Sequence, residues 1–219
     1  MNFQDVVKTR RSVRGYLPKM IPQETLTRIL TLANLAPSNC NIQPWYVYVA
    51  SGQSLQTLKA AYLKAAKNSQ PNPDYPSPRP FPEPYRQRQI DCAIELYKEM
   101  GIARGDKAAR DAATLRNFEF FDAPHVLFIG MDAKFGASVA LDVGMYAQTL
   151  MLALTSEGLA SCAQGALRQY PDIVRDFFGL GDNINILMGL SFGYEDTTVA
   201  ANRTRISRED IAGSVVFRE

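Results

Sequence analysis

The sequence is poor in cysteine and histidine. Its 219 residues contain three widely spaced cysteines, Cys40, Cys92 and Cys162, and a single histidine, His125. Sparse cysteines without a Cys-x-x-Cys pair predict a protein of the reducing cytoplasm and argue against a zinc or dithiol site. A single histidine excludes a multi-histidine metal site, and a hydrolytic triad would have to include His125. Because His125 opens the apolar run 126–129, we interpret it as a residue at the start of a strand.

Other signatures are also missing. The chain lacks a run of about 18 uncharged apolar residues, and residues 1–5 lack the basic-then-apolar order of a secretion signal, so we expect a cytoplasmic protein. A net charge of 24 − 22 = +2 argues against bulk nucleic-acid binding. The sequence Gly179-Leu180-Gly181 lacks the third glycine of the dinucleotide fingerprint, and no Gly-Lys-Ser/Thr phosphate loop is present. A nucleotide cofactor would therefore need another kind of site.

The composition is that of a globular protein, with 46% hydrophobic and 21% charged residues. Periodicity predicts helices that alternate with a few strands, which points to a mixed sheet wrapped by helices. The helix expected at 137–156 is apolar on most sides, which is typical of a core helix or of an obligate interface. The expected helices are 3–7, 22–36, 55–65, 86–100, 107–121, 137–156 and 171–178, and the expected strands are 45–49, 126–131, 184–192 and 215–217.

Residues 71–84 hold seven of the thirteen prolines and cannot form helix interior or a central strand. Such a segment is a domain linker, a proline-rich ligand for a partner, or an extended excursion within one domain. Tyr75, Phe81 and Tyr85 are interleaved with the prolines, and solvated linkers contain few aromatic residues. We therefore predict one domain over residues 1–219, with a proline- and aromatic-rich insertion at about 68–121.

Basic residues gather near both ends of the chain. Guanidinium groups offer planar, paired donors that fit a phosphate, but exposed charged turns with surface ion pairs explain the same residues. The cations are Lys8, Arg10, Arg11 and Arg14 near the start, and Arg203 and Arg205 near the end.

Two further segments are candidates for contact with a flat ligand. Asn39, Asn41 and Gln43 each carry a donor and an acceptor, and in an extended loop alternate residues face one surface. That surface would suit the edge of a heterocycle, whereas a turn with self-satisfied amides is the alternative. Residues 158–167 are uncharged and mostly small, which lets a backbone approach a ligand closely.

Together and in this order, these segments resemble the FMN-dependent nitroreductase family over nearly the whole chain. The resemblance is strongest at residues 10–14, 36–45 and 189–205, while 161–172 and the insertion look like the nitrobenzoate-reductase branch. It implies an α+β fold with a central mixed or antiparallel sheet flanked by helices, in an intertwined homodimer with FMN at the interface. It also implies a ping-pong cycle in which NAD(P)H reduces FMN and a nitroaromatic or quinone substrate is then reduced.

The resemblance further implies residue roles, with the flavin performing the chemistry and no catalytic side chain. The residues expected at the FMN phosphate and ribityl chain are Arg10, Arg11 (through its backbone), Ser12, Arg14, Arg203 and Arg205. Those expected at the flavin ring are Pro37, Ser38, Asn39, Asn41 and Gln43, often from the other subunit, with Asn117 at the pyrimidine and Ala163, Gln164 and Gly165 beside N5. Asn39 and Cys40 depart from the small hydroxyl residues or glycine common there.

The insertion supplies the candidates for substrate binding. Its aromatic residues are predicted to form a lid over a planar substrate: Tyr75, Phe81, Tyr85, Phe118, Phe120 and Phe121. Arg79, Arg86 and Arg88 are candidates for a substrate carboxylate, or are solvated charges. The alternatives are another reaction on the same fold (reductive dehalogenation, dehydrogenation or alkene reduction), a flavin-binding module without turnover, and a scaffold whose proline run recruits a partner. We expect no metal, nucleic acid or membrane partner.

Overall fold

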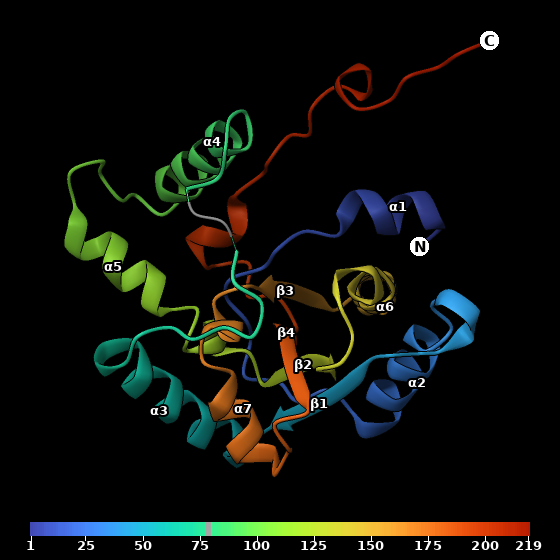
Figure 1. Ribbon diagram of the computed structural model, residues 1–219. Helices are drawn as coiled ribbons and strands as arrows, with labels where there is room; N and C mark the ends of the chain where they lie inside the picture. The colour runs from blue at the N-terminus through green and yellow to red at the C-terminus, as the bar shows by residue number, and fades with distance from the viewer. Residues whose placement is uncertain (78–79) are drawn as a thin grey trace.

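A four-stranded sheet in the order β1-β2-β4-β3 forms the centre of the computed structural model, which describes residues 1–77 and 80–219 (Figure 1). The strands are β1 (Tyr46–Ser51), β2 (His125–Asp132), β3 (Ala160–Gln164) and β4 (Ile184–Gly193). Every neighbouring pair is antiparallel, so the sheet is antiparallel rather than mixed. Strand β3 was not predicted, because its small residues carry no β-branched or alternating signal.

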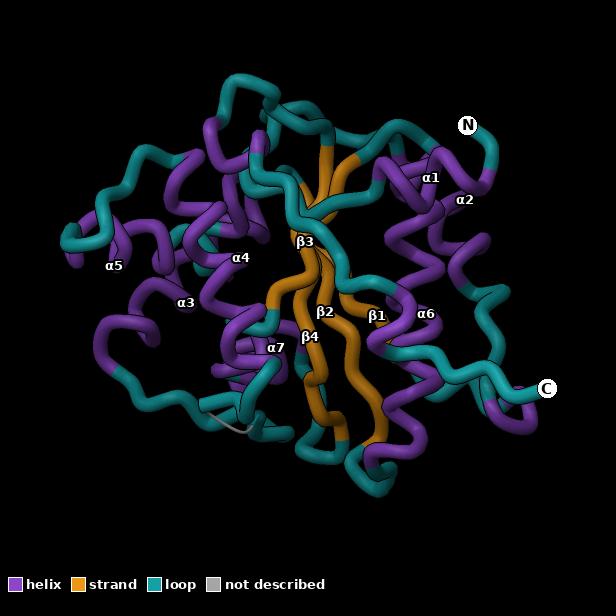
Figure 2. Tube along the Cα trace, turned by 90° about the horizontal axis from the view of Figure 1, so that it is seen from above, coloured by secondary structure: helices purple, strands orange, loops and turns teal. Residues whose placement is uncertain are grey.

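Helices cover both faces of the sheet (Figure 2). On one side lie α1 (Phe3–Thr9), α2 (Gln23–Ala33) and α6 (Ala137–Ser156), and on the other lie α3 (Gln53–Asn68), α4 (Tyr85–Glu99), α5 (Lys107–Leu115) and α7 (Pro171–Phe178). The position of β2 between the two helical layers explains why its sequence is continuously apolar. Leu127 and Ile129 join the core on the α2–α6 side, whereas Val126 and Phe128 join the core on the α3–α7 side. Side chains alternate along a strand, so a strand covered on both faces needs apolar residues at every position.

Helix α6 has the bounds that its sequence predicts. Among the described residues it is long and apolar enough to cross a membrane by length and composition alone, yet it packs against α2, β2 and β3 as a core helix. Its remaining apolar face is open, with Leu141 70% and Met145 38% exposed. The neighbouring helix α1 adds exposed Phe3 and Val7 to the same side of the molecule.

The proline-rich segment is anchored to the fold by Asp74. Its carboxylate accepts hydrogen bonds from Arg175 Nη1 at 2.9 Å and from the main-chain N–H of Ile186 at 2.7 Å, beside an irregularity in the β2–β4 register. Tyr75 packs on the core of the α2–α6 side, and its hydroxyl donates to the carbonyl of Phe135. These contacts fit an excursion within one domain. Arg79 lies outside the described residues.

Two expected elements differ in the structure. The helix expected at 107–121 ends at Leu115, and Phe120, Phe121 and Asp122 have φ values of 56°, 54° and 60°, which exclude helix at the end of the expected range. The run 215–217 forms no strand in the described chain, since no strand lies beside it. Val216 and Phe217 are each 82% exposed on the extended C-terminal tail.

The single histidine is a buried structural residue at the start of β2, as its sequence position suggests. Nε2 of His125 accepts the main-chain N–H of Ile21 at 3.0 Å, which leaves the proton on Nδ1 to be donated to Ser51 Oγ at 2.5 Å. The ring is 1% exposed, and burial lowers the pKa of His125 from 6.5 to about 4.

We therefore expect His125 to make stability depend on pH. The unfolded chain takes up the proton first, so this contribution is complete above about pH 6.5 and is lost as the pH falls towards 4, by up to about 3 kcal/mol. Thermal unfolding at pH 7.5 and pH 5, at fixed protein and cofactor concentration, tests this. The His125→Asn variant should lose less of its Tm between the two pH values than the unmodified protein; equal losses would contradict the assignment.

Candidate functional site

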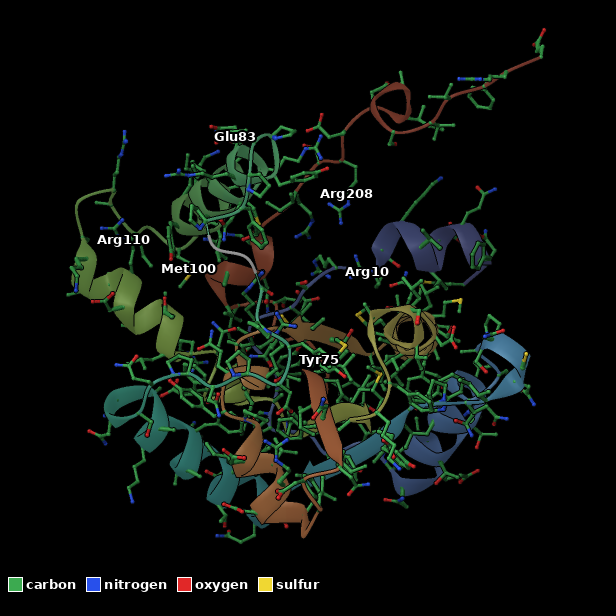
Figure 3. All side chains as sticks on the ribbon, viewed as in Figure 1. Arg10, Tyr75, Glu83, Met100, Arg110 and Arg208 are labelled. Carbon is green, nitrogen blue, oxygen red and sulfur yellow. The ribbon has the colours of Figure 1, made fainter. Side chains whose placement is uncertain are left out.

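A cavity of about 940 Å³ lies between α1, α4, α6 and the C-terminal segment, and we call it the arginine cleft. Arg10 and Arg208 approach it from opposite ends of the sequence (Figure 3). The cleft is lined by Val7, Lys8, Thr9, Arg10, Arg11, Ser12, Arg14, Cys92, Gln148, Thr204, Arg205, Ile206 and Arg208. The N-terminal and C-terminal basic clusters of the sequence therefore meet in one place.

The lining contains six cationic side chains and no carboxylate. Within the described part of the chain, Arg10, Arg14, Arg205 and Arg208 form no ion pair; the last three donate only to main-chain carbonyls. Arg11 differs, because its guanidinium pairs with Glu195. Guanidinium groups without a carboxylate partner are held together at a cost in repulsion unless they share an anion. This donor set fits a phosphate.

Asn202, which the sequence did not single out, joins the two halves of the cleft. Its Oδ1 accepts the main-chain N–H of Arg14 at 2.6 Å, and its Nδ2 donates to the carbonyl of Gly15 at 2.9 Å. Gly15 also lets the side chain of Val199 pack closely on it, since a Cβ there would lie 2.5 Å from Val199. Buried at 3% exposure, Asn202 fixes the position of both basic segments.

Other lining residues were also missed, among them Arg208, Cys92 and Gln148. Arg208 follows Arg205 by three residues in the same basic run, so a wider window would have found it, whereas Cys92 and Gln148 carry no signal in the sequence. Arg203, expected at the phosphate, is outside the lining. It donates to Glu99 Oε2 at 3.1 Å and to the Glu99 carbonyl at 3.2 Å, at the end of α4.

At the end of β3, main-chain N–H and C=O groups point away from the neighbouring strand β4. Ser161 accepts the N–H of Val13 at 3.1 Å, so the backbone of residue 161 points away from β4. Two residues later the backbone of Ala163 points the same way, because strand polarity alternates with period two. Ala163 and Gly165 are exposed. The side chain of Gln164 instead points inward, the residue is 2% exposed, and its backbone faces β4 opposite Gly189, so the groups open to a ligand are those of its neighbours Ala163 and Gly165.

Residues 38–43, which carry Asn39, Asn41 and Gln43 and which we call the amide loop, form a compact left-handed turn and not the extended loop that was expected. Cys40, Asn41 and Gln43 have φ values of 47°, 58° and 46°. The turn is closed by Gln43 N–H donating to Ser38 Oγ at 3.0 Å, and it is fixed to α6 by Asn39 N–H donating to Asp142 Oδ2 at 3.1 Å. The loop is exposed and does not line the arginine cleft of its own chain. Pro37 is likewise exposed.

The aromatic residues of the insertion do not gather into one lid. Phe118 and Phe120 are buried around Tyr62, with ring centroids 6.1 Å and 5.7 Å away, so they are core residues. Tyr75 packs on the opposite core, Phe81 is half-buried, and Tyr85 is exposed at the start of α4. Arg86 is exposed, and Arg88 pairs with Glu209 at 3.3 Å.

Phe121 alone among these rings borders a second cavity, of about 230 Å³. This cavity lies between α4, α5 and residues 199–201, and Arg14 lines both it and the arginine cleft. Its lining is mainly apolar, with Asn117 and Arg116 on the side of the insertion. An apolar wall beside a cationic cleft suits a ligand with a flat ring and an anionic group.

The remaining buried titratable groups near the cleft are structural. Burial raises the pKa of Cys162, which keeps its thiol protonated and unreactive. Burial also raises the pKa of Tyr16, whose hydroxyl contacts the carbonyls of Val13 and Ser191. No group of three or more potential metal ligands occurs among the described residues.

Comparisons with known proteins agree with one another. The family model described as "Nitroreductase family" matches residues 7–194. The chain is 38% identical to the FMN-dependent nitroreductase NfnB from Mycobacterium smegmatis, solved in complex with NADPH, covering 99% of this chain and 97% of that one with a TM-score of 0.95. It is 35% identical to a 4-nitrobenzoate reductase of Pseudomonas putida (99% and 95% covered) and 31% identical to a chloronitrobenzene nitroreductase of Comamonas testosteroni (98% and 96% covered).

Proposed function

The chain belongs to the nitroreductase family, and on that premise we propose that it is an FMN-dependent enzyme that uses NADPH to reduce nitroaromatic compounds. The arginine cleft carries the proposal, because it gathers six cations and no carboxylate in one cavity. The nitroaromatic substrate class follows the full-length relatives, which are named for nitrobenzoate and nitrobenzene compounds. When bound, FMN supplies the two-electron chemistry.

The chain's own residues bind and orient the cofactor. Arg10, Arg14 and Arg205 hold the phosphate, with Ser12 beside the ribityl chain and Arg208 as an additional cation. When FMN is bound, the outward main-chain N–H of Ala163 would donate to the N5 edge of the ring and would favour negative charge there. No side chain acts as a general acid or base in this proposal. Arg203 contributes by pairing with Glu99 and so holding the end of α4.

We also propose a homodimer in which the amide loop reaches the cofactor of the partner. The loop 38–43 is exposed, is rigidly held by Asp142, and does not line its own arginine cleft. Exposed apolar residues on α1, α6 and the tail supply the interface, and they include Phe3, Leu141 and Val216. Strand β1 is an edge of the sheet, which gives an extended tail from a partner a place to add. These features fit the intertwined dimer that the family resemblance implies.

One experiment tests cofactor, assembly and reaction on the same sample. The purified protein is mixed with FMN, separated by gel filtration with light scattering, and examined by visible absorption. We expect about one FMN per chain, a mass of two chains, bleaching by NADPH under anaerobic conditions, and return of the flavin bands on addition of 4-nitrobenzoate.

Each failure has a separate meaning. A colourless protein would overturn the assignment of the arginine cleft. A yellow protein that NADPH does not bleach would be a binding module, and a bleached protein that no nitroarene reoxidises would carry out another reaction on the same fold. A mass of one chain would overturn the dimer alone.

A further inference from the structure

The buried side chain of Gln164 joins the insertion to the sheet. Its Nε2 donates to the Asn117 carbonyl at 2.9 Å and lies 3.4 Å from Asn117 Oδ1, while its Oε1 accepts from Ser191 Oγ. The residue is 2% exposed, and Ser191 on β4 is fully buried. An amide is the side chain that can donate to a carbonyl on one side and accept from a hydroxyl on the other. The arrangement uses both ends of that amide.

Asn117, whose carbonyl accepts this bond, lies in residues 116–122, the segment between α5 and β2 that we call the hinge. Asn117 follows α5 and precedes the three left-handed residues 120–122 that lead into β2. Arg116 pairs with Glu119 and Asp122, so the hinge is a rigid unit rather than a loose loop. A bond to Asn117 therefore fixes the orientation of the whole hinge relative to β3.

The same hinge forms one wall of the smaller cavity. Arg116, Asn117 and Phe121 line it opposite residues 199–201, and it meets the arginine cleft at Arg14. Ala163 and Gly165, the neighbours of Gln164 in the chain, are exposed. Gln164 thus lies between two exposed residues at the proposed flavin edge, and its side chain lies behind the wall of the cavity.

We propose that Gln164 is a positioning residue that sets the distance between the insertion and the reactive edge of the cofactor, and thereby the affinity for the aromatic substrate. This inference rests on the proposed function. Its physical basis is that a site held by a supporting hydrogen bond loses binding when its wall shifts by a fraction of an ångström. Gln164 touches neither cofactor nor substrate through its side chain in this arrangement, so it acts through Asn117.

Two variants separate this role from plain structural support. Gln164→Met keeps the length of the side chain and removes both hydrogen bonds, whereas Ser191→Ala removes only the donor on β4 and leaves the bond to Asn117. We expect Gln164→Met to raise KM for 4-nitrobenzoate about tenfold, with kcat changed less than about twofold and FMN retained. Ser191→Ala should lower Tm to a similar extent through an unpaired buried group, with KM unchanged.

Hydrogen exchange provides a readout that does not depend on turnover. Amide exchange over residues 107–122 should be faster in the FMN-loaded Gln164→Met variant and unchanged in Ser191→Ala. Gln164→Asn, whose amide is too short to reach Asn117, serves if the methionine variant does not fold. The inference is overturned if KM and exchange are unchanged in the Gln164 variants, or if Ser191→Ala shows the same changes. Loss of flavin binding by the unmodified protein would contradict the proposed function; the exchange comparison, made then on the proteins without FMN, still decides whether Gln164 positions residues 107–122.

Discussion

We expect the double variant Arg10→Ala, Arg205→Ala to bind FMN about a thousandfold more weakly than the unmodified protein. Each charge-assisted hydrogen bond to a phosphate contributes about 2 kcal/mol, and two such losses amount to about 4 kcal/mol, or roughly three decades in Kd. Both residues line the arginine cleft, and neither has a carboxylate partner among the described residues. Their removal therefore leaves no unpaired acid that would complicate the result.

Titration of the apoprotein by flavin fluorescence measures this loss. Arg28→Ala is the matched control, because Arg28 is an exposed guanidinium on α2 that pairs with Glu157 at 2.7 Å, away from the cleft. The Arg10→Lys, Arg205→Lys variant should recover part of the affinity, since a lysine keeps the charge but not the paired donors. An affinity within about threefold of the unmodified protein for the double alanine variant would remove these residues from the phosphate site.

The Asp74→Ala variant should be destabilised by about 3 kcal/mol, which for a chain of this size lowers Tm by roughly 6–12 °C. The side chains of Arg175 and Asp74 are only 11% and 12% exposed, so removal of the acid leaves a poorly solvated guanidinium whose remaining carboxylate partner is the exposed Asp172, at 2.7 Å. It also leaves the main-chain N–H of Ile186 without its 2.7 Å acceptor. Thermal unfolding of the FMN-loaded protein gives the measurement.

A double-mutant cycle separates the ion pair from the other contacts of Asp74. Replacing Asp74 and Arg175 together with Leu and Met should cost less than the sum of the single changes, because no buried charge is left alone. The exposed pair Arg28–Glu157 provides the comparison, and breaking it should cost less than about 1 kcal/mol. Equal costs for the two pairs would show that the proline-rich segment is not anchored by Asp74.

This anchor also bears on how the insertion is tested. A deletion of 71–84 would remove Asp74 and Tyr75, two residues that pack on or pair with the body of the fold. Loss of stability would then mask any change in substrate range. Point variants in the insertion test its role in substrate binding without removing this anchor.

Long periodic segments were predictable because their pattern is local. The apolar run that forms β2 and the helix at 137–156 appear where periodicity places them. The spacing of apolar residues along the chain indicates directly whether an element is buried on both faces or on one wide face. Strand β3 was missed for the converse reason. Its residues are small and polar, and only pairing with β4 makes them a strand.

The candidate site was likewise predictable in part from the sequence and decided in part by the tertiary structure. By itself the sequence determined the resemblance to a flavoenzyme family, the two basic clusters, the small-residue segment before residue 165 and the structural place of His125. Tertiary structure decided which of those residues act together. It brought Arg10 and Arg205 into one cleft through Asn202, paired Arg203 with Glu99, turned Gln164 inward, and placed Phe118 and Phe120 in the core. The reason is physical: a local pattern specifies which face of an element is buried, but a side chain's partner depends on contacts between residues far apart in the sequence, 47 positions for Gln164 and Asn117 and 188 for Arg14 and Asn202.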